Sequence, residues 1–221
     1  MMSHRPELSH IKAICFDMDG TLIHTEPIAL SAVREVLQEK YHVSLSHAEE
    51  ASLVGMAWSK AMAKLKEIKQ LDFEVAAFTA EVTSRYEAQI QSGAPLLPGA
   101  TEMVHWLAQR YPLALVSGST RSQILTSMTF HKLLNQFQFV LGFEDYLESK
   151  PSPAGYLMAA KKLGIPAAHC LVLEDSAPGI ASAKAAGMFA MAVAAGNYTQ
   201  QAITQADYQI ATLWDLKTLL P

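Results

Sequence analysis

The sequence predicts an α/β protein: a Rossmann-like, doubly wound parallel sheet core with an inserted small all-helical cap domain. One short apolar run with β-branched and aromatic residues opens the chain, and from about residue 94 similar runs alternate with helical segments. Such alternation is typical of a parallel sheet with helices on both faces. Between these parts, about 70 residues show helical periodicity alone, which indicates an inserted helical domain.

The first strand is predicted over residues 11–16 and is followed by Asp17, Asp19 and Gly20. Residues at i and i+2 project to the same side of an extended chain, and Gly20 allows a sharp turn after them. Ligands bind at the carboxyl ends of strands in open α/β sheets, so we expect both carboxylates at the mouth of a site. Taken alone, they could equally be ordinary turn acids.

The inserted segment is predicted to form several amphipathic helices. Pro27 suits a first helical position, Ser46 with Glu49 fits a capping box, and Asp72 can cap a longer helix, while Gly55 interrupts the pattern. Apolar residues at helical spacing form the inner faces: Ala29, Val33, Val36, Leu37, Tyr41, Met62, Leu65, Ile68, Leu71, Val75, Phe78, Val82, Tyr86 and Ile90. We therefore place the cap at 27–93 and the α/β core at 1–26 with 94–221.

The remaining strands are predicted at 113–116, 137–141, 170–173 and 190–194, with 206–210 as an edge. Helices are predicted at 101–110, through Leu125 and Met128, at 154–162 and at 179–186. Gly187 follows the last of these helices and suits a left-handed cap.

Composition narrows the class of protein. The 221 residues are 50% hydrophobic and 17% charged, which is a globular composition, and the net charge of −4 gives no basic footprint for nucleic acid. No apolar stretch reaches the length of a membrane span and the first ten residues do not resemble a signal peptide, so we expect a cytoplasmic protein without a membrane partner. The oligomeric state is not readable from the sequence, and a monomer is compatible with it.

Cys15 and Cys170 each fall inside a predicted strand. They are expected to be small buried hydrophobes in a reducing compartment, and a disulfide between them is disfavoured.

Three further polar groups follow later apolar runs. Ser117 and Gly118 come where a strand passes into a helix, an arrangement that offers backbone N–H groups and a hydroxyl to a phosphate, whereas Ser119 or Thr120 could be the helix cap. Lys150 precedes two prolines. A lone loop lysine is usually solvated, but the positive charge of this ammonium would balance the negative charges of Asp17 and a phosphate.

Glu174 and Asp175 complete the set, again at the end of a predicted strand. Crowded carboxylates repel one another unless a cation is present, and hard oxygen ligands favour Mg²⁺. The sequence therefore predicts a magnesium site near a phosphate-binding loop.

These residues resemble the four motifs of the haloacid dehalogenase superfamily of phosphotransferases. Asp17-x-Asp19-Gly20-Thr21 matches the first motif, Ser117 the second, Lys150 the third and Glu174-Asp175 the fourth. The resemblance spans nearly the whole chain. The helical insertion between the first two motifs is similar to the subgroup with a small helical cap, which includes sugar-phosphate phosphatases and β-phosphoglucomutase.

The resemblance implies a role for each residue. Asp17 would be the nucleophile that forms an aspartyl-phosphate, and it would need no depressed pKa, because a carboxylate is already ionised at neutral pH. Asp19 would protonate the leaving alcohol and then activate water, while its backbone carbonyl binds Mg²⁺. The carboxylates of Asp17, Glu174 and Asp175 would complete the metal site. Ser117, Gly118 and Lys150 would hold the phosphoryl group.

The chain departs from the family pattern in the cap. Trp58 stands roughly where the mutases have a substrate-contacting arginine, and Ala29 stands at the position of the mutase histidine. Both differences weaken a mutase interpretation. His24 lies where the subgroup often has an aspartate and is a minor candidate for substrate contact. Trp58 is a candidate specificity residue, with packing in the cap's own core as the alternative.

The predicted function is a Mg²⁺-dependent phosphatase that acts on a small phosphorylated metabolite, such as a sugar phosphate. The alternatives are a phosphomutase of the β-phosphoglucomutase type, a dehalogenase, and a non-catalytic phospho-accepting module such as a receiver domain. Asp19 and the acid pair argue against a dehalogenase, which needs neither a leaving-group acid nor a metal. In a receiver domain the order of acceptor and acid pair is reversed.

Overall fold

The computed structural model describes residues 5–53, 56, 58–91, 93–197 and 203–221. The chain divides into two compact units, of which one runs up to His24 and resumes at Pro95, and the other is Thr25–Ala94. Gly55, which interrupts the predicted helical pattern, lies outside the described residues.

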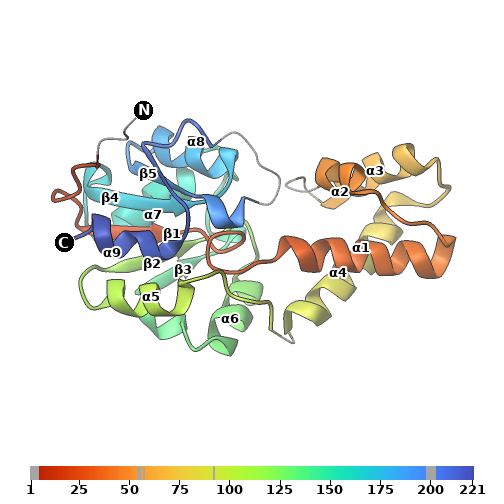
Figure 1. Cartoon of the computed structure of the whole chain (residues 1–221), viewed down its shortest axis with the longest axis horizontal. Helices are drawn as coiled ribbons and strands as arrows, with labels where there is room; N and C mark the ends of the chain where they lie inside the picture. Colours follow the sequence, from red (N-terminus) through yellow and green to blue (C-terminus); the bar gives the residue numbers. More distant parts are fainter. Residues whose placement is uncertain (1–4, 54–55, 57, 92, 198–202) are drawn as a thin grey trace. The chain divides into compact units, whose positions relative to one another are not determined.

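The first unit is built on six parallel strands, in the order β3-β2-β1-β4-β5-β6 (Figure 1). Their bounds are β1 Ala13–Phe16, β2 Leu113–Val116, β3 Phe139–Leu141, β4 Cys170–Glu174, β5 Phe189–Val193 and β6 Tyr208–Ile210. Every residue of β1, β2 and β4 is buried, because helices cover both faces of the sheet. The predicted doubly wound parallel sheet is confirmed.

The strand order reverses between β1 and β4, and β1 pairs with β2 on one side and β4 on the other. Phe16, the last residue of β1, lies opposite Leu115 of β2 and Leu173 of β4. The carboxyl ends of these three strands therefore meet at one edge, where open α/β sheets bind ligands.

The helices of this unit are α5 Ala100–Ala108, α6 Arg121–Phe130, α7 Ala154–Leu163, α8 Ala177–Ala185 and α9 Leu216–Leu219. Thr120 and Gln123 form a capping box at the start of α6, and Ser176 caps α8 by accepting a hydrogen bond from the N–H of Gly179. Gly187 has φ +72°, as expected of a left-handed cap. Cys15 and Cys170 are buried free thiols, as predicted.

The second unit contains α1 Glu26–Tyr41, α2 His47–Leu53, α3 Trp58–Lys69 and α4 Val75–Gln91. The predicted inner faces enclose one buried apolar cluster, which includes Val33, Val36, Leu37, Met62, Leu65, Phe78 and Val82. This arrangement confirms the predicted helical cap. Within the described chain, every helix is too short or too polar to cross a membrane.

The predicted capping box at α2 is present, since the Ser46 N–H donates to Glu49 at 2.7 Å and the Glu49 N–H donates to Ser46 Oγ at 3.4 Å. The predicted cap at Asp72 is wrong. α4 begins at Val75, and the Glu74 carboxylate accepts the N–H groups of Ala76 and Ala77. The Glu74 side chain folds back onto the first turn of the helix and accepts hydrogen bonds from its free N–H groups. Asp72 lies too far before the start of α4 to reach them.

Candidate active site

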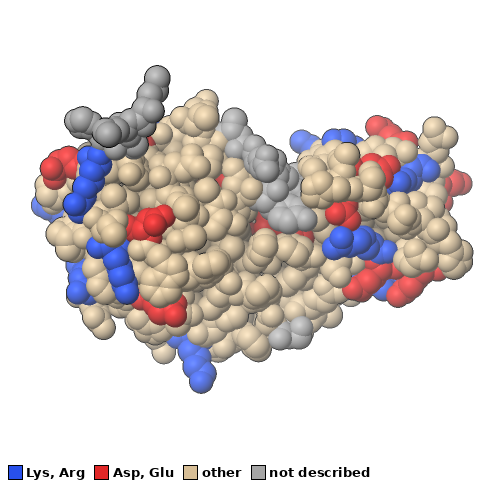
Figure 2. All heavy atoms as spheres, in the orientation of Figure 1, with Lys and Arg blue, Asp and Glu red and all other residues tan. Residues whose placement is uncertain are grey.

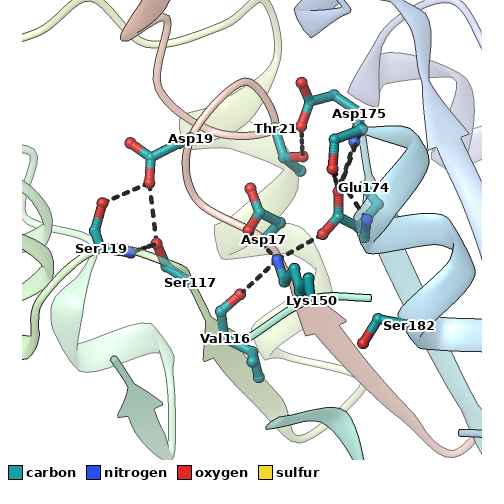
Figure 3. Close-up of polar contacts among 12 residues, drawn as sticks. Asp17, Asp19, Thr21, Val116, Ser117, Ser119, Lys150, Glu174, Asp175 and Ser182 are labelled. Carbon is teal, nitrogen blue, oxygen red and sulfur yellow. Dashed lines mark hydrogen bonds and ion pairs between the residues drawn. The ribbon is translucent and has the colours of Figure 1, made fainter. Parts of the chain in front are cut away.

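The predicted site residues gather at the carboxyl edge of β1, β2 and β4 (Figure 3). Asp17 follows β1, Ser117 follows β2, and Glu174 is the last residue of β4. All three side chains are buried, and Glu174 and Ser117 have no exposed surface. Buried polar groups are costly unless they are paired, so the partners of each group define what the site can do.

Lys150 enters this edge from the loop that precedes α7, and it is not a solvated loop lysine. Its ammonium donates to Asp17 Oδ1, to Glu174 Oε1 at 2.5 Å and to the Val116 carbonyl at 3.3 Å, which uses all three of its hydrogens. Burial alone would lower the pKa of Lys150, but the charges of Asp17 and Glu174 outweigh it and hold this pKa well above its usual value. Lys150 is therefore a fixed cation.

The Glu174 carboxylate accepts five hydrogen bonds. Its Oε1 accepts from the Tyr156 hydroxyl at 2.9 Å as well as from Lys150, and its Oε2 accepts from the backbone N–H of Asp175 and from both the N–H and the hydroxyl of Ser176. Gly179 leaves the space that this carboxylate fills, because a Cβ there would lie 1.8 Å from Oε1. Glu174 thus has one permitted position.

Three carboxylates, of Asp17, Glu174 and Asp175, each offer an oxygen within 4.8 Å of the other two. Burial first, and then the charges of Glu174 and Asp19, raise the pKa of Asp17 well above its usual value against the opposing effect of Lys150. The pKa of Asp17 is thus raised, whereas the sequence suggested only that it need not be lowered. One ammonium among three carboxylates leaves two negative charges, and this set of hard oxygen donors fits a divalent cation.

Asp19 lies on the loop after β1 and contacts two serines of the loop after β2. Its Oδ2 accepts hydrogen bonds from Ser117 Oγ at 3.0 Å and from Ser119 Oγ at 2.8 Å (Figure 3). Its Oδ1 is buried and accepts no hydrogen bond from the described residues. The alternative raised by the sequence is resolved, since Thr120 is the cap of α6 while Ser119 contacts Asp19.

The loop after β1 is shaped around Asp175. Gly20 has φ +80°, which a residue with a side chain rarely adopts, and a Cβ there would lie 2.2 Å from Asp175 Oδ2. Thr21 donates to the other oxygen of Asp175 at 3.3 Å. After β2, the space beside the Cα of Gly118 is open, and the carbonyl of Ser117 is held by the Tyr146 hydroxyl at 2.8 Å.

The remaining candidates from the sequence are His24 and Trp58. His24 ends the first segment of the α/β unit, and its backbone N–H donates to the Pro95 carbonyl at 2.8 Å, where the chain returns to this unit. Trp58 is partly buried against the apolar cluster of the helical unit, with its ring edge-on to Tyr86 at a centroid distance of 5.3 Å.

Sequence reasoning missed four residues that support the site: Ser119, Tyr146, Tyr156 and Gly179. The signal for Tyr156 was available, because a tyrosine on the buried face of a helix needs a polar partner for its hydroxyl. The role of Gly179 depends on the path of the Glu174 side chain, which no local pattern reveals.

A family model described as haloacid dehalogenase-like hydrolase matches residues 14–193, which include every motif of the site. The chain belongs to this family. The predictions of the family, the fold and the enzyme class are therefore confirmed for this haloacid dehalogenase-like hydrolase.

Named relatives of this hydrolase include phosphatases. The chain is 32% identical to the fructose-1-phosphate phosphatase YqaB of Escherichia coli over 81% of its own length and 95% of that protein. It is also 32% identical to a bifunctional riboflavin kinase/FMN phosphatase of Arabidopsis thaliana, over 92% of its own length but only 54% of that longer protein. Here the chain spans about half the length of its relative.

The fold is also shared with solved structures. A predicted phosphoglycolate phosphatase from Haemophilus somnus superposes with a TM-score of 0.85 over 97% of this chain and 100% of that chain, at 21% identity. At this identity the likeness shows the fold of the hydrolase.

Proposed function

We propose that this hydrolase is a cytoplasmic, Mg²⁺-dependent phosphatase that hydrolyses a small phosphorylated metabolite through an aspartyl-phosphate on Asp17. The observation that carries the proposal is the pairing of the buried Asp17 carboxylate with Lys150, beside a cluster of carboxylates that could hold a divalent cation. A nucleophile, a cation for the phosphoryl group and a metal site then lie at one edge of the sheet.

In the first step, a carboxylate oxygen of Asp17 forms a bond to phosphorus while the ester P–O bond breaks. Asp19 gives its proton to the departing oxygen, which leaves as an alcohol. In the second step, a water molecule gives a proton to Asp19 and its oxygen attacks phosphorus. The bond between Asp17 and phosphorus then breaks, which releases inorganic phosphate and restores both carboxyl groups.

The other residues bind and orient. The Ser117 hydroxyl, the Gly118 N–H and the Lys150 ammonium would hold phosphoryl oxygens, and most of the catalysis would come from this electrostatic positioning. The carboxylates of Asp17, Glu174 and Asp175, with the backbone carbonyl of Asp19, would hold Mg²⁺. When bound, this ion would neutralise charge on the phosphoryl group and would favour the ionised form of Asp17.

The substrate class follows from the relatives and from the charge of the chain. Fructose-1-phosphate phosphatase and FMN phosphatase are named for small phosphate esters, and this chain is net acidic, which disfavours a polyanionic nucleic acid. We infer that the helical cap selects the leaving group, with Trp58 as the candidate residue for that contact.

The proposal is tested by phosphate release from 4-nitrophenyl phosphate and from a panel of phosphorylated sugars, glycolate, nucleotides and polyols. EDTA should abolish activity, Mg²⁺ should restore it, and Ca²⁺ should inhibit because its looser coordination misplaces nucleophile and phosphate. Full activity in a metal-free preparation would contradict the proposal. Isomerisation of β-glucose 1-phosphate without phosphate release would instead establish the phosphomutase alternative.

A further inference from the structure

We propose that Ser119 is a positioning residue for Asp19: its hydroxyl holds Oδ2 of the carboxyl group, so that Oδ1 transfers the proton. This inference rests on the proposed function, in which Asp19 serves as the acid and base. Ser119 is not part of the four motifs identified in the sequence, which suggested only a helix cap for it.

The two oxygens of Asp19 have unequal environments. Oδ2 accepts two hydroxyl hydrogen bonds, whereas Oδ1 is buried and accepts none from the described residues. A buried carboxylate oxygen without a partner is costly, and such groups in folded proteins usually serve a function. With Oδ2 held by a hydroxyl donor, Oδ1 is the oxygen left to face the reacting groups.

The two serines cannot share this task once a phosphate is bound. In the proposed function, the Ser117 hydroxyl donates to a phosphoryl oxygen and no longer donates to Asp19. Ser119 then remains as the hydroxyl donor to Oδ2, and its hydrogen bond is already the shorter of the two, at 2.8 Å against 3.0 Å. Ser119 would therefore keep Asp19 oriented during the reaction itself.

Ser119 is well placed to hold a carboxyl group because its own backbone is fixed on both sides. Its N–H donates to Ser117 Oγ at 2.9 Å, and its carbonyl accepts from the N–H of Phe143 at 3.1 Å. The next residue, Thr120, caps α6 through a reciprocal capping box. A short side chain on such a frame gives precise placement, as a supporting residue of an active site requires.

The consequence is a dependence on the leaving group. A nitrophenolate leaves without a proton, whereas an alkoxide needs one from Asp19 Oδ1 as the P–O bond breaks. Loss of the Ser119 hydroxyl should thus slow the first step only for esters of poor leaving groups. The second step always needs Asp19, since water must give up a proton.

The experiment compares Ser119→Ala with wild type on 4-nitrophenyl phosphate and benzyl phosphate, two aromatic esters that differ in the basicity of the leaving oxygen. We expect kcat/KM for benzyl phosphate to fall about tenfold and that for 4-nitrophenyl phosphate to change less than about twofold. For 4-nitrophenyl phosphate, kcat and KM should fall together, because hydrolysis of the phosphoenzyme becomes slower.

Thr120→Ala is the matched control, since it removes the neighbouring hydroxyl and loosens the start of α6 without touching Asp19. It should lower Tm, at a cost of about 1 kcal/mol, and leave the ratio of the two kcat/KM values unchanged. Equal losses on both esters for Ser119→Ala, no loss on either, or the same ratio change in Thr120→Ala would each overturn the inference. If the wild type hydrolyses neither ester, it is the proposed function that fails.

Discussion

The α/β unit and the helical unit use charged residues in opposite ways. In the α/β unit, Asp17, Lys150 and Glu174 are buried together and every charge has a specific partner. In the helical unit, ion pairs such as Arg85 with Glu39 and Lys40 with Glu81 lie at the surface, where Figure 2 shows charges of both signs gathered.

The two kinds of charged residue should respond differently to substitution. Buried charges are expensive to maintain, so a chain that keeps them in a network uses them for a task, while exposed pairs contribute little to stability. Substitutions in the buried network should therefore act on turnover, and substitutions in the helical unit on specificity or stability.

The largest effect is expected for Asp17→Asn, which retains the shape of the side chain but removes the nucleophile. Turnover should fall by at least about a thousandfold, as loss of a covalent nucleophile requires. The Tm should not fall, because burial and the neighbouring carboxylates already disfavour the charge on Asp17.

Asp72→Asn is the matched control, because the Asp72 side chain is fully exposed and lies 3.7 Å from Lys66. It should leave activity unchanged. Activity of Asp17→Asn within about tenfold of wild type would show that Asp17 is not the nucleophile.

Gly179→Ala should have the next largest effect, although residue 179 contacts no substrate in the proposed mechanism. The new Cβ would occupy the place of the Glu174 carboxylate, which five hydrogen bonds prevent from moving freely. Displacing Glu174 removes a partner of Lys150, so we expect kcat/KM to fall about tenfold to a hundredfold, the cost of overpacking a tight site.

Gly164→Ala separates this effect from a general loss of stability. Gly164 ends α7 with φ +69° and has open space around it, so alanine there strains the backbone by about 1 kcal/mol without reaching the site. Its Tm should fall while kcat stays constant. The same kinetic loss in both variants would show that Gly179 acts through stability alone.

Trp58→Ala should act on specificity and not on the chemical step. If Trp58 contacts the leaving group, kcat/KM for the preferred metabolite should fall about tenfold, or roughly 1.4 kcal/mol of transition-state binding, while hydrolysis of 4-nitrophenyl phosphate changes little. Tyr86→Ala removes the same ring contact from the other side and serves as the control. Equal losses on both substrates in both variants, with a lower Tm, would show that Trp58 only packs.

The smallest effect concerns the surface of the helical unit. Hydrogen bonds from Lys69 and then from Ser46 lower the pKa of Glu49 from 4.5 to about 2. A carboxyl group with a lowered pKa stabilises the fold above its unfolded pKa, and this contribution is lost as the pH falls from about 4.5 to about 2. Glu49→Gln should therefore show a smaller fall in Tm across this range than wild type, and identical falls would contradict this assignment.

Sequence alone predicted the sheet, the cap and the positions of the chemical groups, because these depend on periodicity and on strand ends. Asp17, Ser117 and Glu174 follow apolar runs, and parallel strands bring such positions to one edge. Ser119 and Tyr156 were missed because their roles depend on partners that lie 100 and 18 residues away in the chain. The raised pKa of Asp17 likewise depends on burial and on neighbouring charges that only the fold brings together.

The most direct test of the mechanism is the intact mass of Asp19→Asn after exposure to 4-nitrophenyl phosphate and Mg²⁺. This ester needs no proton on its leaving group, so Asp17 can still be phosphorylated, but without Asp19 no group activates water to release it. We predict a persistent gain equal to one phosphoryl group, carried by Asp17 and absent from the Asp17→Asn/Asp19→Asn double variant. A protein that never gains this mass, although it binds Mg²⁺ and the ester normally, would contradict the covalent mechanism.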